Sequence, residues 1–222
     1  MLISCIKRDD TVRDLVSLGV VEQSGADSTA SSAILDEEIE TTCARLILEW
    51  SGRPPGEIPL LEPSRELYRA FGVDPTKTRP SSEALLRRVL RGKGFPRVSP
   101  LVDLANLWAL VSGLSVGLYD CEAIEGGSIV VRMGGSKERY PGIGKSDIRL
   151  EGRLVLADDE GPFGNPSADS SRTSVSTGTR HCLYVLFAPS SYDVGALDRW
   201  TGWLRERAAA YFGGTSFSGV LP

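Results

Sequence analysis

Residues 99–133 have the sequence SPLVDLANLWALVSGLSVGLYDCEAIEGGSIVVRM, and the predicted fold is built outward from them. Ser99 in the capping position, Pro100 in the first turn and Gly113 after the last apolar residue are the start and stop signals of a helix. Apolar side chains surround this helix instead of forming a stripe, which predicts burial on nearly all sides. Strands are expected at 116–119 and 128–133, with the second returning through a turn at 125–127.

Two polar side chains interrupt the apolar surface of this helix. Asp103 and Asn106 are three residues apart and therefore lie on one face. A buried polar group without a partner costs roughly 1–3 kcal/mol, so both side chains must meet either protein partners or a ligand. Two interpretations stay open: a structural hydrogen-bond pair that fixes the next turn, or part of a binding site.

The spacing of apolar residues predicts the other elements. Helices are expected at 10–18, 35–50, 64–71, 81–91 and 193–212. Strands are expected at 2–6, 18–23, 147–150, 153–157 and 182–188, with a hairpin turn at 151–152 and an edge strand in the tail after Gly214. Because helices and hairpins mix without a regular βαβ alternation, the sequence predicts an α+β fold, a mixed sheet with packed helices, in a single domain over residues 1–222.

Composition excludes several classes of protein. Hydrophobic residues make up 41% and charged residues 24% of the chain, and no apolar run is long enough to span a bilayer. The first ten residues lack the apolar stretch of a secretory signal, so a cytoplasmic location without a membrane partner is expected. The four cysteines are far apart and there is one histidine. This pattern indicates neither a zinc site nor a disulfide framework, and no metal or cofactor is expected.

Basic residues gather in one segment of an acidic chain. The formal net charge is −4, yet residues 77–97 contain seven basic side chains and one acidic side chain, Glu83. This segment is either a footprint for a phosphate backbone or a solvated helix face. Glu83 and Arg87 are four residues apart and close enough to pair along the helix, where a surface pair contributes under roughly 1 kcal/mol.

Residues 158–180 form a long stretch that is poor in large apolar side chains and rich in Gly, Ser, Thr and Asp. A loop of this length inside a compact domain is usually functional or disordered. Arg172 and Thr173, with Ser174 and Thr177, are its candidates for recognition, and flexible filler is the alternative. His181 follows the loop and is expected to be structural, because no carboxylate or nucleophile has a visible sequence relation to it.

Known catalytic motifs are absent from the sequence. No phosphate-binding GxxxxGK[ST], dinucleotide-binding GxGxxG, GxSxG elbow or HExxH helix is present in its required context. An enzyme built on this chain would therefore work by positioning, by hydrogen-bond donors and through a group of the substrate itself.

Residues 100–133 resemble the B3/B4 domain of the phenylalanyl-tRNA synthetase beta subunit. The resemblance lies in a Val-Asp-hydrophobic-x-Asn helix, a short strand ending in Asp, an x-Ile-x-Gly turn and an Ile-Val-Val-Arg strand. The preceding RPSSEALLRR, residues 79–88, resembles the version in freestanding B3/B4 proteins. The similarity is strong at 79–133 and weaker across the rest of residues 1–215.

The resemblance implies an aminoacyl-tRNA-binding pocket, because in the synthetase this domain hydrolyses tyrosine wrongly attached to phenylalanine tRNA. It would place Asn106 in that pocket. The chain departs from the family where the editing histidine is replaced by Gly117, where a threonine is replaced by Ala105, and where no editing glutamate matches within 158–179. These departures argue against the synthetase's own tyrosine editing but leave hydrolysis of another aminoacyl ester open.

The leading hypothesis is a trans-editing factor that binds mischarged tRNA and hydrolyses its ester. Asn106 is the candidate catalytic residue, and Gly117 would leave room for a side chain or water. The candidate substrate-binding residues are Arg79, Ser82, Glu83, Arg87, Asp103, Gly117, Asp120, Arg132, Arg172 and Thr173, with Arg88 and Arg91 as further phosphate contacts. Asp103 and Asp120 can instead hold an arginine in place. The rivals are a non-catalytic module that binds RNA, an amino acid or a small ligand, and a structural, partner-binding protein.

Overall fold

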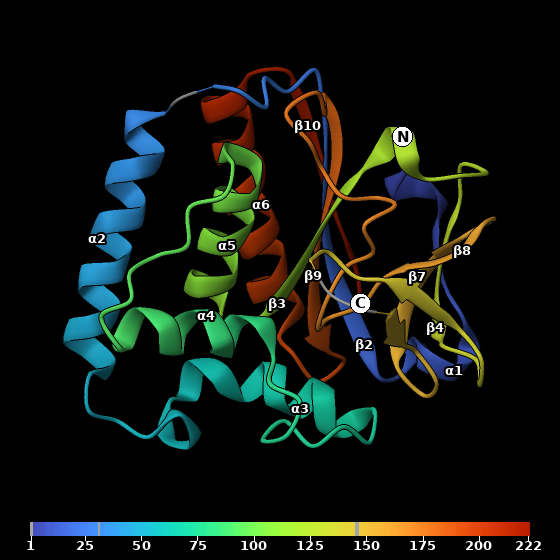
Figure 1. Ribbon diagram of the computed structural model, residues 1–222, viewed down its shortest axis with the longest axis horizontal. Coiled ribbons are helices and arrows are strands. Elements are labelled where there is room, and N and C mark those ends of the chain that lie inside the picture. Colours follow the sequence, from blue (N-terminus) through green and yellow to red (C-terminus); the bar gives the residue numbers. More distant parts are fainter. Residues whose placement is uncertain (1, 31, 145–146) are drawn as a thin grey trace.

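A computed structural model describes residues 2–30, 32–144 and 147–222 (Figure 1). Helices form one side of the molecule and strands the other. The larger helices are α2 (Ala33–Trp50), α3 (Glu62–Ala70), α4 (Ser81–Leu90), α5 (Pro100–Ser112) and α6 (Val194–Phe212). Two 3-10 turns, η2 (Pro55–Glu57) and η3 (Pro59–Leu61), connect α2 to α3, and α1 (Asp10–Arg13) is a single turn on the strand side.

Two four-stranded sheets make up the strand side. The central sheet is antiparallel, with the order β10-β2-β9-β3, and consists of β2 (Val16–Ser24), β3 (Ser115–Asp120), β9 (His181–Pro189) and β10 (Thr215–Leu221). The outer sheet has the order β1-β4-β7-β8 and consists of β1 (Ile6–Arg8), β4 (Ile129–Met133), β7 (Leu154–Asp158) and β8 (Gly161–Gly164). It is mixed, because β1 and β4 are parallel. The strands β5 (Arg139–Pro141) and β6 (Asp147–Arg149) form a separate pair. The α+β class is confirmed.

The central sheet is covered on both faces, which explains the unbroken apolar run in β9. Tyr184 and Leu186 point to the core shared with α5 and α6. Leu183, Val185 and Phe187 point to the core between the two sheets. The protein therefore has three layers, with helices, central sheet and outer sheet in that order (Figure 1).

The predicted strand pair around the turn at 125–127 is wrong. β3 pairs with β9 at the edge of the central sheet, whereas β4 pairs with β1 and β7 in the outer sheet. The chain turns away after β3 in η4 (Cys121–Ala123), where the Asp120 side chain accepts a hydrogen bond from Glu122 N. The hairpin predicted at 151–152 is wrong for the same reason, since β6 pairs with β5 and β7 with β4 and β8.

Three of the predicted segments differ from the structure, and a fourth is confirmed. A 3-10 turn, η1 (Ile3–Cys5), replaces most of the strand expected at 2–6, and β1 starts only at Ile6. The helix expected at 10–18 stops at Arg13, because Val16 already begins the buried strand β2. The loop expected at 158–180 contains β8. The edge strand after Gly214 is confirmed as β10, which pairs with β2 along its whole length.

Candidate functional site

Asn106 lies on the face of α5 that is turned toward α4. Ala109 and Leu110, three and four residues further along α5, pack with Leu86 and Val89 of α4 in one buried cluster. Side chains at these spacings share a helix face, so the Asn106 amide lies on the same face, one turn earlier. It is half-buried, and no described residue makes a hydrogen bond with it. The amide therefore keeps its donors and its acceptor for water or a ligand.

Asp103, on the same helix, has partners inside the protein. Its Oδ1 accepts a hydrogen bond from Val98 N at 2.9 Å, and its Oδ2 lies 3.2 Å from Arg97 Nε. Burial raises the pKa of Asp103 above its ordinary value, and the contacts to Val98 and Arg97 offset only part of that effect. The Asp103 carboxylate thus holds the backbone that leads into α5. The Ser99 side chain, which was expected to cap the helix, makes no capping hydrogen bond. Asp103 thus holds an arginine, as one of its expected alternatives states, but no hydrogen bond joins it to Asn106 among the described residues.

Glu83 is the most unusual side chain of α4. It is 2% exposed, and its carboxylate meets three guanidinium groups: Arg65 Nε at 2.8 Å, Arg87 Nη1 at 3.3 Å and Arg79 Nε at 3.6 Å. The expected pairing of Glu83 with Arg87 along the helix is confirmed, but its expected surface location is wrong, since the carboxylate is buried and shared. Three positive charges around one negative charge leave a net charge of +2 in this cluster. The Glu83 hydrogen bond raises the pKa of Arg65.

Ser82, a neighbour of Glu83, also points into the protein. Its Oγ donates to the carbonyl oxygen of Gly113 at 2.8 Å, and Ser64 Oγ makes the same bond at the same distance. Gly113 has φ +72°, and a Cβ there would overlap the Leu60 carbonyl oxygen. Ser82 therefore ties the start of α4 to the end of α5 and α3. This contact positions α4 on its neighbours.

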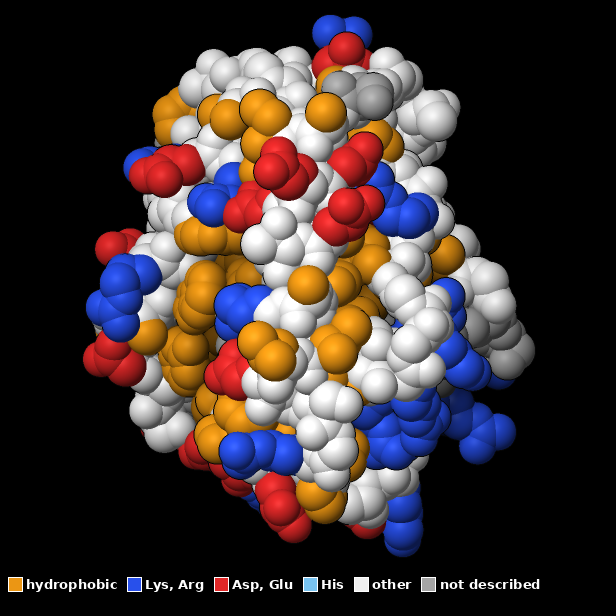
Figure 2. All heavy atoms as spheres, turned by 90° about the vertical axis from the view of Figure 1, so that its left-hand side faces the viewer, with side chains coloured by type: hydrophobic (Ala, Val, Ile, Leu, Met, Phe, Trp, Pro, Cys, Tyr) orange, Lys and Arg blue, Asp and Glu red, His pale blue; other side chains and the backbone are white. Residues whose placement is uncertain are grey.

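The outer face of α4 is basic. Arg88 Nε donates to the Gly94 carbonyl oxygen at 3.1 Å, which closes the end of the helix, and Arg91 follows as the C-terminal residue. Figure 2 shows Lys and Arg side chains gathered at the lower right of the view, on the side where α4 meets the lower end of α2. The last turn of α4 and its C-cap thus carry Arg87, Arg88 and Arg91.

Gly117 lies on the opposite face of the central sheet from Asn106. Its neighbour Tyr119 points into the core between the sheets, and side chains two residues apart in a strand share a face. A Cβ at Gly117 would overlap the Tyr119 hydroxyl, as would a Cβ at Gly164. The expectation that Gly117 leaves room for a ligand is thus corrected, because the Tyr119 phenol fills that space. The Tyr119 hydroxyl donates to Asp169 Oδ1 at 2.7 Å.

Asp120 holds the loop that follows β8. Its Oδ2 accepts a hydrogen bond from Thr179 Oγ1 at 2.6 Å, and its backbone N donates to the Thr173 carbonyl oxygen at 2.9 Å. Thr173 is fully buried, and its hydroxyl has no hydrogen-bond partner within the part of the chain that the structure describes. These contacts attach the loop to the end of β3 at Thr173 and Thr179, which argues against flexible filler. Neither side chain is open to a large ligand.

Arg172 and Arg132 are both neutralised within the protein. Arg172 makes two bonds of 2.9 Å to the carboxylate of Asp158 and a third, of 3.0 Å, to the Ala123 carbonyl oxygen. Arg132 makes two bonds of 2.7 Å to Glu138. Paired in this way, each guanidinium has few donors left for a substrate.

The predicted site residues therefore separate into two groups. Asp103, Asn106, Ser82, Glu83, Arg79 and Arg87 lie together in the helical layer. The others lie at the far end or on the far side of the central sheet: Gly117, Asp120, Arg132, Arg172 and Thr173. The expected pocket, lined by Asn106, Asp103 and Arg132 with room left at Gly117, is not formed, because Arg132 lies in the outer sheet and the space at Gly117 is filled by Tyr119. As ligand-binding residues, the helical-layer group stays a prediction.

His181 has a partner that sequence spacing did not reveal. Its Nε2 lies 2.8 Å from Oε1 of Glu22, and the other carboxylate oxygen of Glu22 accepts from Ile3 N at 3.0 Å. Burial on its own would raise the pKa of Glu22, but these hydrogen bonds outweigh it and lower the pKa. The pairing of β2 with β9 brings the two residues together, so their separation of 159 positions hides the contact.

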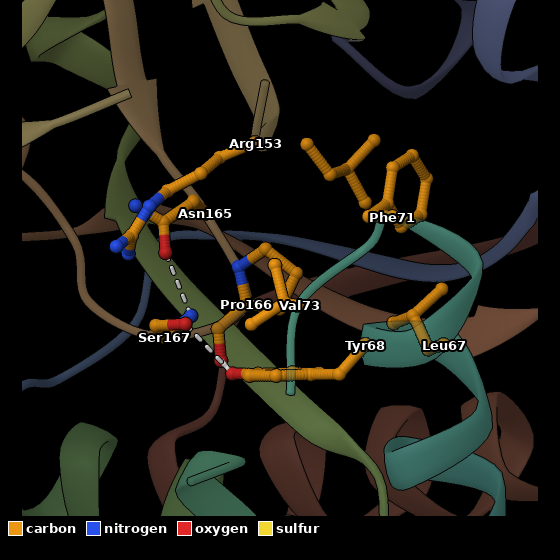
Figure 3. Close-up of a pocket in the computed structure, with 9 residues that line it drawn as sticks. Leu67, Tyr68, Phe71, Val73, Arg153, Asn165, Pro166 and Ser167 are labelled. Carbon is orange, nitrogen blue, oxygen red and sulfur yellow. Dashed lines mark hydrogen bonds between the residues drawn. The ribbon is translucent and has the colours of Figure 1, made fainter. Parts of the chain in front are cut away.

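A small pocket lies between α3 and the residues after β8 (Figure 3). Tyr68 closes one side, where its hydroxyl hydrogen-bonds to Ser167 Oγ at 2.8 Å and to the Pro166 carbonyl oxygen at 3.0 Å. Arg153 and Asn165 stand at the opposite side. With about 30 Å³, the pocket holds water but not an aminoacyl group.

The chemistry open to the helical-layer group is hydrogen bonding and charge stabilisation. Among the described residues, no three His, Cys, Asp or Glu side chains are arranged to hold a metal ion, and no helix could cross a membrane. Asn106 offers a neutral donor and acceptor, and the arginines of α4 offer binding to anions.

The chain matches a family model and is similar to solved structures. The B3/4 domain model matches residues 64–209. A crystal structure of an N-terminal fragment of the phenylalanyl-tRNA synthetase beta-subunit from Pyrococcus horikoshii is similar over 98% of the chain, with 14% identity and a TM-score of 0.48. The chain spans 54% of the length of that fragment. No curated protein matches the sequence.

Proposed function

Since the chain belongs to the B3/4 domain family, we propose that it is a cytosolic trans-editing factor, which binds a mischarged tRNA and hydrolyses the ester of its amino acid. One observation carries the proposal: a half-buried amide without a described partner, Asn106, lies on the α4 side of α5, and the outer face of α4 is basic. A phosphate backbone on α4 would bring the end of an RNA strand close to this amide.

The proposed reaction needs no protein nucleophile. A water adds to the ester carbonyl, the bond from carbon to the ribose oxygen breaks, and the ribose oxygen takes up a proton. The Asn106 amide would donate a hydrogen bond to the carbonyl oxygen as negative charge develops there. Removal of one such donor typically lowers the rate by about 10²–10³. A neighbouring ribose hydroxyl would orient the water, because no described side chain near Asn106 is a free base.

Deacylation of a panel of aminoacyl-tRNAs tests the proposal. We expect the wild-type protein to hydrolyse one or two members of the panel and Asn106→Ala to do so roughly a hundredfold more slowly. Asn106→Asp is the matched control, because it keeps the shape of the side chain and removes the amide donor, so it should be slow as well. Both variants should still bind RNA. Wild-type rates in the two variants would overturn the role of Asn106, and a wild type that hydrolyses no member would overturn the editing activity.

A second function, a non-catalytic module that binds an amino acid or another small ligand, is favoured by one feature. The space at Gly117 is filled by Tyr119, and the only histidine is tied to Glu22. Isothermal titration with free amino acids separates the two functions. An editing factor should bind free amino acids weakly, whereas the binding module should show saturable binding and no deacylation.

A further inference from the structure

A groove of about 330 Å³ lies where the end of α2 meets the end of α4. Its walls are Gly52, Arg53, Pro54 and Pro55 on one side, and Arg87, Leu90 and Arg91 on the other. Three arginines thus face one hollow from two separate segments of the chain. We propose that this groove binds a phosphate group of RNA, which deepens the proposed function and rests on it for the RNA partner.

Two of the three arginines are held in place by contacts that leave hydrogen-bond donors free. Arg87 Nη1 lies 3.3 Å from the buried carboxylate of Glu83, which is anchored in turn by Arg65 at 2.8 Å. The Arg53 guanidinium lies over the Trp50 ring, 5.3 Å from its centroid. Arginines that are ordered before binding lose little conformational entropy when an anion arrives.

Arg53 and Arg91 have no acidic partner among the described residues. Glu49 pairs with Arg45, and Glu62 pairs with Arg69. Glu57 follows the groove in η2 but does not line it. The positive charge in the groove is therefore not neutralised by the acidic side chains around it.

The partial negative charges at the C-terminal ends of α2 and α4 are too small to neutralise the arginines of the groove. A helix C-terminus carries roughly half a negative charge, so the ends of α2 and α4 together supply about −1. Arg53 and Arg91 supply +2, and Arg87 adds part of a further charge because it shares the Glu83 carboxylate with Arg65 and Arg79. More than one positive charge therefore remains for a ligand, which is enough for a phosphodiester and favours a phosphate monoester further.

The shape of the groove favours phosphate over a lone carboxylate. Guanidinium groups on two sides can each donate to different oxygens of a tetrahedral group, and arginine binds phosphate through paired N–H bonds. Leu90, Pro54 and Pro55 add apolar surface that would contact the attached sugar or base. The phosphate can be a strand terminus or an internal phosphodiester, and the experiment distinguishes the two.

The test measures fluorescence anisotropy of labelled RNA oligonucleotides that differ only in a 5′-phosphate or 5′-hydroxyl. The wild-type protein is compared with Arg53→Gln/Arg91→Gln, and Arg205→Gln is the control, because Arg205 is exposed on α6 away from the groove. Arg87 is left intact, since it pairs with Glu83. We expect the double variant to bind roughly ten- to hundredfold more weakly, with a shallower salt dependence, and the control to bind as wild type.

Each outcome decides the question. A loss confined to the 5′-phosphorylated oligonucleotide identifies a terminal phosphate, and an equal loss for both identifies an internal phosphodiester. Binding of inorganic phosphate that the double variant loses, without RNA binding by the wild type, keeps the groove as a phosphate site but overturns the RNA partner and the proposed function. Equal affinities of wild type and double variant for RNA would refute phosphate binding in the groove, whatever the deacylation assay shows.

Discussion

The Tyr119 side chain explains why residue 117 is a glycine. The Tyr119 phenol is fully buried and occupies the volume that a side chain at residue 117 would need. Burial, together with the neighbouring Asp169 carboxylate, raises the pKa of the Tyr119 hydroxyl well above its ordinary value, so the hydroxyl stays protonated and donates. Glycine at 117 is therefore a packing requirement of this protein.

Substitution of Gly117 by Ala should destabilise the protein. The added methyl group would overlap the Tyr119 hydroxyl inside a closed core, and overpacking of this kind costs about 1–3 kcal/mol. Chemical denaturation of both proteins measures the difference in unfolding free energy. Gly202→Ala is the matched control, because a Cβ at Gly202 meets nothing within 4 Å and a helical alanine is favoured over glycine. Equal stability of Gly117→Ala and wild type would refute this account of the packing.

Asp158 makes the stability depend on pH. Burial on its own would raise the pKa of Asp158, but hydrogen bonds from Arg172 and from the backbone N–H groups of Glu125 and Gly161 outweigh it and lower the pKa. A lowered pKa means that the folded state holds the proton less tightly than the unfolded state. The stabilisation is present above the ordinary Asp value of about 3.9 and is lost as the pH falls below it.

Asp158→Asn should therefore be less stable than wild type at pH 7, by roughly 1.5–3 kcal/mol, the contribution of hydrogen bonds to a charged group. The difference should shrink as the pH falls from 5 to 3, because protonation removes the same charge from the wild type. Thermal unfolding across this range measures it, with exposed Asp198→Asn as the control. A difference that stays constant with pH would rule out the ion pair as its source.

At the scale of elements, α4 combines an apolar inner face with a charged outer face. Leu85, Leu86 and Val89 are buried against α5 and the 3-10 turn before α3. The polar contacts of Ser82 and Glu83 then fix how the helix sits on its neighbours. The outward arginines are thereby displayed from a rigid support, which is what recognition of a phosphate backbone requires.

Glu83→Gln should weaken the attachment of α4. The change removes the carboxylate that the three guanidinium groups share and should lower the unfolding free energy by roughly 1.5–3 kcal/mol. Urea denaturation measures the loss. Glu37→Gln, on the exposed face of α2, should change it by less than about 0.5 kcal/mol. If both variants unfold alike, the Glu83 cluster adds nothing to stability.

At the scale of the whole molecule, the central sheet is the layer that both cores share. Its edge strand β10 pairs with β2 over seven residue pairs, from Thr215 to Leu221. Without β10, the backbone donors and acceptors along that side of β2 would be open, next to a strand of mostly buried residues. Open edges of this kind pair with other chains.

A chain that ends at Gly214 should therefore self-associate. Size-exclusion chromatography with light scattering would show assemblies larger than those of the full chain, together with a lower unfolding temperature. A chain that ends at Leu221 keeps every β10 pair and is the control. A monodisperse shortened chain with the unfolding temperature of the control would mean that β10 does not protect the sheet.

Many of the elements were predictable from local sequence. The helix α5 follows from Pro100 and Gly113, β9 from its unbroken apolar run, and α2 and α6 from their apolar spacing. The sequence singles out Asn106 as a polar residue on a mostly buried helix, and its ligand-binding role stays a prediction. Asp103, three residues away, has partners inside the protein. Helix spacing alone does not distinguish Asp103 from Asn106 in this respect.

Sequence by itself determined where the helices and buried strands form and that a basic segment accompanies them, because capping residues, apolar periodicity and charge act between near neighbours. Tertiary structure alone decided which strands pair, that Glu83 gathers three arginines, that Glu22 meets His181, and that Tyr119 fills the space beside Gly117. Each of these depends on segments far apart in the chain that meet only after the layers pack. Register and burial are then set by the fit of whole surfaces, which no local pattern records.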